Sequence, residues 1–200
     1  VEVVVVDNAS TDRTASIVQQ RMTGRPWLRL VTESVRGYGA AYLCGLKSAK
    51  GKFFFMADAD GTYDFKDMPR FVEKLRAGAD MVIGDRFASG LAKGTMPWLH
   101  RYVGNPLLSS ITRLFFKIKI HDIHCGARGM TREAFERITL YTTGMEFASE
   151  MIIKAAKAHL KIVEIPIVYA PRIGESKLNS FGDGWRHLRF ILLYSPLILF

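Results

Sequence analysis

An acidic pair, Asp58 and Asp60, directly follows an apolar run in the stretch FFFMADADGTYDF of residues 53–65. Two kinds of chemistry use carboxylates in this pattern. In one, the first carboxylate is a nucleophile that accepts a phosphoryl group, and the second acts as an acid or base. In the other, two carboxylates at positions i and i+2 of a loop bind one hard cation, such as Mg²⁺ or Mn²⁺, which in turn binds phosphate oxygens.

The neighbouring sequence favours the cation. A phosphatase with an aspartate nucleophile needs a further acidic segment, and the nearest match is Asp85 in MVIGDR. Asp85 has no acidic partner within the next turn, and it follows Asp60 by only 25 positions (85 − 60). Two strand–helix units also precede the acidic pair, whereas the nucleophile of such enzymes stands on the first strand. We therefore interpret Asp58 and Asp60 as cation ligands.

Alternating strands and helices must position these carboxylates. We expect strands at residues 1–6, 28–33, 53–57, 80–84 and 161–171, and helices at 14–22, 40–49 and 70–78. This alternation predicts an α/β fold with a mostly parallel sheet flanked by helices, and the β-branched run of residues 1–6 predicts a strand buried on both faces. Ligands bind at the carboxyl ends of such strands, so Asp7, Asp58 and Asp85 are expected to share one crevice.

The second half of the chain is less regular. Residues 105–120 predict a helix with one apolar side and several cations, which suits either a membrane surface or packing on the sheet. Further helices are expected at 133–138 and 146–159. His121 and His124 have the i,i+3 spacing of metal ligands, but no cysteine or acidic partner completes a zinc set, so no zinc site is expected.

Composition limits the class of partner. The 200 residues, of which 48% are hydrophobic, are enough for one substantial core and predict a single domain. The net charge of +9 suits an anionic partner, which could be nucleic acid, a phosphorylated substrate or an acidic membrane leaflet, although a merely basic soluble protein fits equally. The only two cysteines, Cys44 and Cys125, form no disulfide framework, and a reducing compartment is expected.

Five short motifs occur in an order that resembles a known enzyme family. They are DNASTD at 7–12, RGYGAA at 36–41, DAD at 58–60, GDR at 84–86 and RIGESK at 172–177. Together they resemble the DDGSTD, NxGxGxA, DxD, GSR and RxGxSK segments of family-two inverting glycosyltransferases with the GT-A fold. Within that family the chain is most similar to the polyprenyl-phosphate and dolichyl-phosphate hexose synthases, and the resemblance extends over essentially all 200 residues.

The resemblance implies a GT-A nucleotide-diphospho-sugar transferase domain at residues 1–189, without the family's opening strand. Residues 171–189 would form an acceptor-phosphate loop and a membrane-interface helix. The apolar run of residues 190–200 is too short to span a bilayer alone, and either a buried C-terminal helix or the start of a truncated membrane-associated segment fits it. The basic and aromatic residues before it, around Trp185, favour the membrane-associated segment.

The resemblance also implies roles for individual residues. Asp60 would bind the metal directly, Asp58 would support it or contact the sugar-ribose side, and Thr62 stands where relatives place a further polar metal contact. Arg86 would stabilise the leaving diphosphate. The remaining substrate-binding candidates are Asp7 and Asn8 for the base and ribose, Gly37 and Gly39 in the glycine turn, and Arg172, Ser176 and Lys177 for the acceptor phosphate.

Two acidic segments have less definite roles. Glu146 and Glu150 lie one helical turn apart, and an acceptor-side role and a structural role are equally compatible with that spacing. Asp122 and Cys125 match a family segment that shapes the acceptor side.

The predicted reaction is the transfer of a hexose, with inversion, from UDP-glucose or GDP-mannose to a polyprenyl or dolichyl phosphate. Mg²⁺ or Mn²⁺ would be the cofactor, and the enzyme would act at the cytoplasmic face of a membrane without binding nucleic acid. The alternatives are a metal-dependent glycosyltransferase with another acceptor and a non-catalytic basic adaptor at a membrane surface. A processive polysaccharide synthase is disfavoured because the chain has no QxxRW motif.

Overall fold

The computed structural model describes residues 1–91, 95–174 and 180–195. The strands are β1 (Val3–Asn8), β2 (Leu28–Glu33), β3 (Phe53–Met56), β4 (Met81–Asp85), β5 (Arg128–Thr131) and β6 (Ile162–Pro166). The α-helices are α1 (Thr14–Met22), α2 (Tyr38–Ser48), α3 (Met68–Arg76), α4 (Asn105–Phe116), α5 (Arg132–Arg137), α6 (Phe147–Lys157) and α7 (Ser180–Tyr194). A 3₁₀ turn, η1 (Phe65–Asp67), precedes α3, and a π-helical turn, η2 (His100–Gly104), precedes α4.

The strands form a parallel pair, β1–β2, and a four-stranded sheet in the order β3-β5-β4-β6. In the larger sheet, β5 is antiparallel to both β3 and β4, while β4 and β6 are parallel. Strands β3, β4 and β6 therefore run in the same direction and end at the same edge, as the alternating pattern predicted. The sequence did not predict β5, whose residues RGMT lack the β-branched alternation of a typical strand.

Strand β1 differs from the expectation that it is buried on both faces. Only Asp7 of β1 is buried, and Val3 is 40% exposed. Within the described residues β1 pairs with β2 along one edge, and the adjacent helix α1 contributes no buried residue. The β-branched composition of residues 1–6 thus identified the strand correctly but was wrong about its burial.

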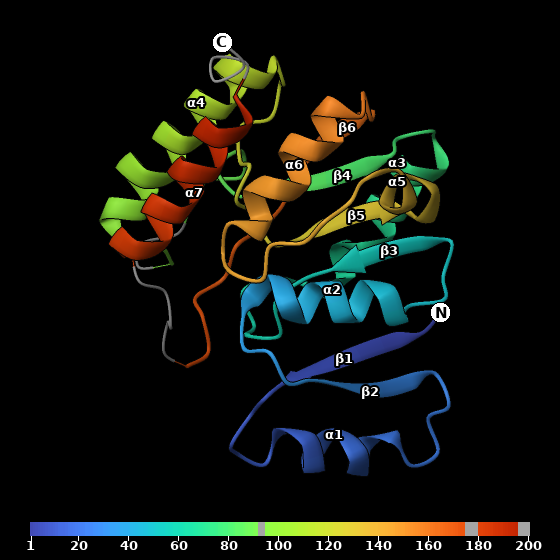
Figure 1. Ribbon diagram of the computed structural model, residues 1–200. Coiled ribbons are helices and arrows are strands. Elements are labelled where there is room, and N and C mark those ends of the chain that lie inside the picture. Colours follow the sequence, from blue (N-terminus) through green and yellow to red (C-terminus); the bar gives the residue numbers. More distant parts are fainter. Residues whose placement is uncertain (92–94, 175–179, 196–200) are drawn as a thin grey trace.

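Helices cover the four-stranded sheet and enclose the main core. Figure 1 shows α2 between the two sheets, α3 and α5 near one end of the larger sheet, and α4, α6 and α7 gathered on the other side. Helix α6 is the most deeply buried, because Phe147, Met151 and Ile152 are fully inaccessible to solvent. The core built from these layers holds the loops at the ends of β3 and β4 in place.

Helix α7 packs on α4 and α6 and extends across the expected boundary at residue 189. Phe190 and Ile191 are buried against Ile153 of α6, with side chains of α4 around them. The first part of the predicted membrane-associated segment is thus packed into the fold, while residues 196–200 lie outside the described part of the chain. Within the described residues, no helix is both long and apolar enough to cross a bilayer.

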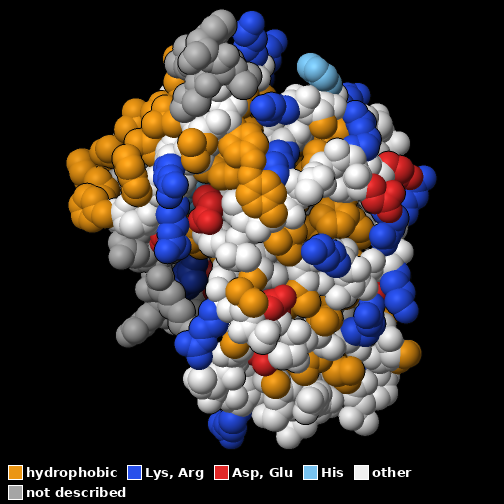
Figure 2. All heavy atoms as spheres, viewed as in Figure 1, with side chains coloured by type: hydrophobic (Ala, Val, Ile, Leu, Met, Phe, Trp, Pro, Cys, Tyr) orange, Lys and Arg blue, Asp and Glu red, His pale blue; other side chains and the backbone are white. Residues whose placement is uncertain are grey.

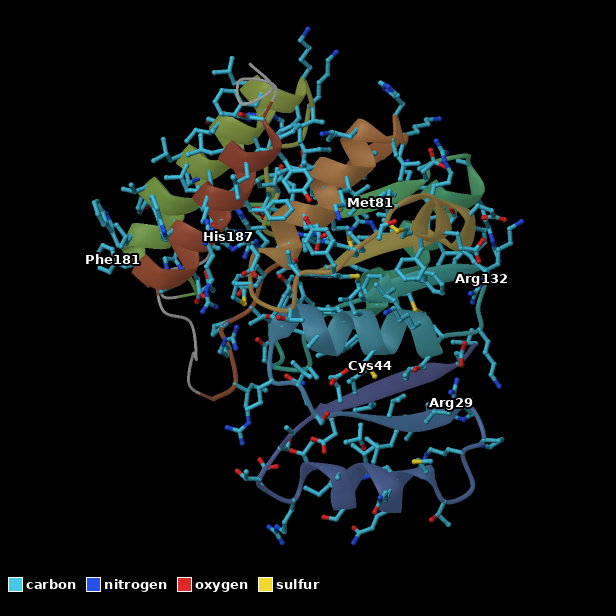
Figure 3. The ribbon with its side chains drawn as sticks, viewed as in Figure 1. Arg29, Cys44, Met81, Arg132, Phe181 and His187 are labelled. Carbon is cyan, nitrogen blue, oxygen red and sulfur yellow. The ribbon has the colours of Figure 1, made fainter. Side chains whose placement is uncertain are left out.

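A pair of histidines, of which His187 is buried, connects α7 to the core. The Oγ of Ser149 lies 2.8 Å from Nδ1 of His187 and 3.2 Å from Nε2 of His124, and the two imidazole rings are 4.4 Å apart. Figure 3 shows His187 on α7, at some distance from Phe181 near the start of that helix. Burial, with the charge of Arg128 adding to it, lowers the pKa of His187 to about 4.

We expect this histidine to make the fold sensitive to acid. Because the pKa of His187 is lower in the folded chain than the usual value near 6.5, the unfolded chain binds more protons below that pH. The free energy of unfolding should therefore fall as the pH drops from about 6.5 toward 4, by up to about 1.4 kcal/mol per pH unit. Urea unfolding at several pH values should show a shallower dependence for His187→Asn. The exposed His159→Asn serves as the control, and an unchanged slope in His187→Asn would contradict this account.

Candidate functional site

The loop after β3 presents Asp58 beside a cluster of aromatic rings. The hydroxyl of Tyr42, on α2, donates a hydrogen bond of 2.6 Å to Oδ1 of Asp58. The ring of Tyr42 stacks on Phe147 with a centroid separation of 6.1 Å, which fixes the hydroxyl in place. Burial raises the pKa of Asp58, the bond from Tyr42 opposes that rise, and the charge of Asp60 adds to it.

The second carboxylate, Asp60, is oriented by its own loop. Its Oδ1 accepts hydrogen bonds from the backbone N–H of Thr62, at 3.0 Å, and from the Thr62 hydroxyl, at 2.6 Å. The Thr62 side chain is buried, so its hydroxyl is committed to positioning Asp60. Within the described residues, Oδ2 of Asp60 is buried and accepts no hydrogen bond of good geometry.

The segment that carries Arg172 lies directly against this loop. The N–H of Ile173 donates to the carbonyl of Asp60 at 2.8 Å, and the N–H of Ala170 donates to the carbonyl of Thr62 at 3.0 Å. Nη2 of Arg172 lies 2.9 Å from Oδ2 of Asp60, an ion-pair contact whose angles fall outside those of a hydrogen bond. Two motifs more than 100 residues apart in the sequence are therefore in direct contact.

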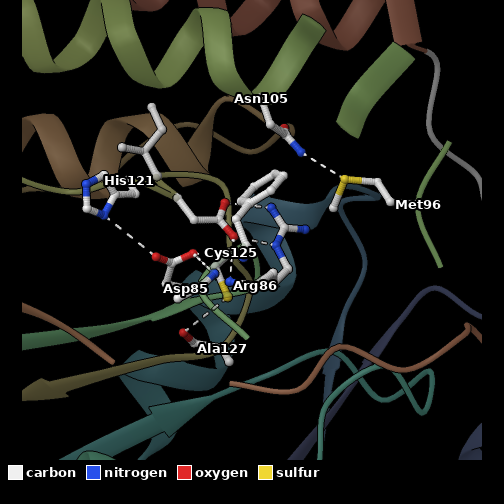
Figure 4. Close-up of polar contacts among 12 residues, drawn as sticks. Asp85, Arg86, Met96, Asn105, His121, Cys125 and Ala127 are labelled. Atoms are coloured by element: carbon white, nitrogen blue, oxygen red, sulfur yellow. Dashed lines mark hydrogen bonds and ion pairs between the residues drawn. The ribbon is translucent and has the colours of Figure 1, made fainter. Parts of the chain in front are cut away.

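Arg86, predicted to act on the diphosphate, is held in a buried ion pair. Its Nε and Nη2 donate to the two oxygens of Asp122 at 2.6 and 2.7 Å, and its backbone N–H donates to the same carboxylate at 3.2 Å. Its guanidinium carbon also lies 5.2 Å from the centre of the Tyr169 ring. Burial acts to lower the pKa of Arg86, but Asp122 more than offsets this, so the guanidinium stays charged. Figure 4 shows Arg86 and the contacts around it.

The end of β1 supplies Asp7 and Asn8. Asp7 is buried and accepts a bond of 3.3 Å from the N–H of Ser10. The Asn8 amide spans the loop between β2 and α2: its nitrogen donates to the carbonyl of Val35 at 2.7 Å, and its oxygen accepts from the N–H of Gly37 at 2.8 Å. Asn8 thus organises the glycine turn, a structural role that the motif match did not suggest.

The glycine turn packs closely against the segment before α6. A Cβ placed on Gly37 would lie 2.2 Å from the carbonyl oxygen of Thr143, and one on Gly39 would lie 2.2 Å from that of Thr142. The N–H of Gly39 donates to the carbonyl of Gly144 at 3.2 Å. Both glycines are therefore needed for close backbone approach, while a role in binding the donor stays a prediction.

The strand end at Asp85 forms a separate cluster. Oδ1 of Asp85 accepts bonds from the N–H groups of Phe87 and Ala88, and its Oδ2 lies 3.7 Å from Nδ1 of His121. The same imidazole nitrogen lies 3.1 Å from Glu164. The expectation that His121 has no acidic partner was wrong, because those partners come from β4 and β6 and are distant in sequence.

The structure assigns a role to Glu150 of α6, one of the two acidic residues of this segment. Glu150 is fully buried and accepts bonds from the backbone N–H groups of Tyr141 and Thr142, and it pairs with Lys154 at 2.6 Å. Its role is structural, since it fixes the segment that packs on the glycine turn. Glu146 stands before α6 and keeps a buried Oε2 without a hydrogen-bond partner in the described chain. The predicted residues Ser176 and Lys177 lie outside the described residues.

Comparison with known proteins identifies the family. Residues 1–139 match the model of glycosyl transferase family 2. The chain belongs to glycosyl transferase family 2. The family predicted from the motifs is thereby confirmed. This family 2 chain is 44% identical over 198 residues to the low-salt glycan biosynthesis hexosyltransferase Agl6 of Haloferax volcanii, covering 98% of this chain and 47% of that relative.

A second relative from the same organism is similar over most of its length. The dolichyl-phosphate hexose transferase of Haloferax volcanii is 32% identical over 183 residues, covering 92% of this chain and 76% of the relative. The chain described here spans about half the length of Agl6 but most of the length of this second protein.

A solved structure confirms the GT-A fold predicted for this family 2 chain. The glucosyl-3-phosphoglycerate synthase of Mycobacterium tuberculosis, in complex with Mn²⁺, uridine diphosphate and glucosyl-3-phosphoglycerate, superposes with a TM-score of 0.72. The two chains are 19% identical, and the match covers 97% of this chain and 68% of the synthase.

Proposed function

We propose that the chain transfers a hexose from a nucleotide diphosphate sugar to a polyprenyl or dolichyl phosphate, with inversion at the anomeric carbon. UDP-glucose is the first candidate donor and GDP-mannose the second. The names of the two Haloferax relatives, a hexosyltransferase and a dolichyl-phosphate hexose transferase, support this class of reaction.

One contact carries the proposal: the 2.9 Å approach of Arg172 to Asp60. The acidic loop suits a metal that binds the donor diphosphate, and the segment of Arg172 suits an acceptor phosphate. Because the two segments are hydrogen-bonded to each other, a donor on one would lie next to an acceptor on the other. Such proximity is the main requirement of a transfer between two bound phosphate compounds.

The acidic loop fits a divalent cation. Oδ2 of Asp60 is buried and, in the described chain, has the ion-pair contact with Arg172 but no hydrogen-bond partner. Oδ2 of Asp58 lies near Gly126, where an added Cβ would approach it to 2.9 Å. These two oxygens would hold Mg²⁺ or Mn²⁺, with Thr62 and Tyr42 fixing the carboxylates. The bound ion would neutralise negative charge on the departing diphosphate.

The acceptor side needs charge rather than a strong base. A phosphate monoester is already anionic near neutral pH, since its second pKa is near 6. Arg172 would bind that anion once the cation has taken its place on Asp60, and Ser176 and Lys177 are predicted to add contacts. Arg86 would act on the donor diphosphate through the part of its guanidinium that Asp122 does not hold.

A membrane location is supported by the surface of η2, α4 and α7. Figure 2 shows hydrophobic side chains gathered at the upper left, over α4 and α7. Exposed members of this surface include Trp98, Tyr102, Leu107, Leu114, Phe181 and Trp185. Aromatic and basic side chains at the edge of an apolar surface are typical of proteins that bind a bilayer, and we propose that this surface faces the cytoplasmic leaflet.

The proposal is tested by assaying the protein in its full natural length with each donor, Mn²⁺ and a short polyprenyl phosphate. We expect a lipid-linked hexose of inverted configuration with one of the two donors. Parallel reactions with a water-soluble phosphate monoester test for another acceptor. If no donor gives any product, and Asp60→Asn leaves donor binding unchanged, the chain is not a transferase and the adaptor alternative stands.

Arg172→Ala should separate acceptor binding from donor binding. Loss of a charge-assisted contact costs about 1.5–3 kcal/mol, so the KM for the lipid phosphate should rise by at least about tenfold while the donor KM changes little. The affinity for Mn²⁺ should increase, because Arg172 no longer competes for Asp60. The matched control is Arg70→Ala, which removes an exposed arginine paired with Asp67. Equal changes in both KM values would argue against an acceptor role for Arg172.

A further inference from the structure

A second group of ligand-type side chains lies at the ends of β4 and β6. Within the residues that the structure describes, Asp85, His121 and Glu164 form the one group of three whose potential ligand atoms all lie within 4.8 Å of one another. None of the three belongs to the acidic loop of Asp58 and Asp60. The group is therefore a separate candidate for ligand binding.

The strand register places the two carboxylates on one face of the sheet. Ile83 of β4 is the partner of Glu164 on the parallel strand β6. Side chains alternate along a strand, so Asp85, two residues beyond Ile83, points to the same face as Glu164. The arrangement follows from the backbone and does not depend on the conformation of a flexible loop.

Backbone hydrogen bonds hold both carboxylates in place. Asp85 uses Oδ1 to accept the N–H groups of Phe87, at 2.8 Å, and Ala88, at 3.1 Å. Glu164 accepts the N–H of His121 at 3.0 Å and that of Asp122 at 2.8 Å. Oδ2 of Asp85 takes no part in these bonds, whereas Oε2 of Glu164 also accepts the backbone N–H of His121 at 3.0 Å. Both oxygens lie near the same imidazole nitrogen of His121, and Figure 4 shows the contact between His121 and Asp85.

Two carboxylates this close need a cation. The side chains of Asp85 and Glu164 are only 8% and 12% exposed, whereas the His121 side chain is 68% exposed. The imidazole of His121 adds a third ligand atom within 4.8 Å of both carboxylates.

We propose that Asp85, His121 and Glu164 bind one divalent transition-metal ion, of which Zn²⁺ is the expected example. Metal–ligand bonds near 2.1 Å place neighbouring ligand atoms about 3–4 Å apart, and Nδ1 of His121 already lies 3.1 Å from Glu164 and 3.7 Å from Asp85. One imidazole and two carboxylates suit Zn²⁺, Co²⁺ or Ni²⁺, whereas the all-oxygen pair of Asp58 and Asp60 suits Mg²⁺ or Mn²⁺. The exposed ring of His121 leaves room for water as the fourth ligand.

The ion would act as a clamp next to the predicted donor site. It would link β4, β6 and the segment of residues 121–122, adding to the hydrogen bonds that this segment already makes to Glu164. Asp122 is the residue that holds Arg86. Binding of the ion would thus stabilise the position of Arg86 without contacting the sugar donor.

The test is metal binding by the full-length protein after treatment with a chelator. Calorimetric titration with Zn²⁺ should show one site, and Co²⁺ should give visible absorption bands typical of mixed nitrogen and oxygen ligation. His121→Gln should weaken Zn²⁺ binding by at least about tenfold and abolish those bands. It should also remove the rise in Tm that Zn²⁺ causes in the wild-type protein.

Two control variants make the result specific. Asp60→Asn alters the proposed donor-metal pair, and His159→Asn removes an exposed histidine outside the cluster; both should bind Zn²⁺ as the wild type does. The inference fails if the wild type shows no Zn²⁺ site, if His121→Gln binds as tightly as the wild type, or if Asp60→Asn abolishes binding. The readouts do not involve transfer activity, so the result is independent of the proposed function.

Discussion

Asp60→Asn is expected to lower kcat/KM for hexose transfer by about 10³-fold, because the substitution removes a charged ligand from the proposed cation while keeping the shape of the loop. An asparagine oxygen can still accept the hydrogen bonds that Thr62 donates to Oδ1, at 3.0 and 2.6 Å. The fold of the loop should therefore survive, and the loss should arise from the cation site. Steady-state assays over a range of Mn²⁺ concentrations, together with electron paramagnetic resonance of bound Mn²⁺, measure both effects.

The control for this prediction is Asp64→Asn, which alters an exposed carboxylate four positions later in the same loop. Asp64 caps the 3₁₀ turn by accepting the N–H of Lys66 at 2.9 Å, a contact that asparagine can also make. Its substitution should leave activity and Mn²⁺ binding near the wild-type values. If Asp60→Asn and Asp64→Asn behave alike, Asp60 is not a metal ligand.

The sequence was most informative where function depends on a short contiguous motif. The apolar run before Asp58 identified β3, whereas the shared cation that the spacing of Asp58 and Asp60 suggests stays a prediction. Both depend on neighbouring residues, whose local conformation the sequence largely determines. The family was also predicted correctly, because several short motifs in a fixed order constrain a family more than any one of them does.

Strand β5 and the contacts of Asp122 and His121 were not predicted, because they depend on the order of strands in the sheet. Strand β5 inserts between β3 and β4, although it is formed by a glycine-containing segment that the sequence did not predict to be a strand. Because β5 lies beside β4, the residues that precede β5 in the chain lie close to β4 and β6. There Asp122 pairs with Arg86, and His121 contacts Glu164. Such pairs are separated by more than 30 residues, so spacing along the chain holds no signal for them.

The role of Glu150, on helix α6, was also not predictable from sequence spacing. Its spacing from Glu146 was compatible with an acceptor-side role or a structural one. The structure buries Glu150 completely and satisfies it with two backbone N–H groups and Lys154. A signal of this kind is absent from the sequence, because the bonding partners belong to an irregular segment whose path depends on tertiary packing.

Asp122→Ala is expected to lower the free energy of unfolding by about 3–5 kcal/mol, since it leaves a buried guanidinium without its partner. Asp122 is fully buried, Arg86 is 7% exposed, and the two side chains form a bidentate pair at 2.6 and 2.7 Å. Urea unfolding followed by circular dichroism measures the loss. A change below about 1 kcal/mol would mean that the pair contributes little to stability.

The double variant Arg86→Met with Asp122→Leu separates the structural role of this pair from a catalytic one. Replacing both charges with apolar side chains of similar size removes the unpaired ion, so the double variant should be more stable than Asp122→Ala. If Arg86 binds the donor diphosphate as predicted, transfer activity should stay low despite the restored stability. If activity returns together with stability, Arg86 only supports the fold, and its proposed contact with the diphosphate is wrong.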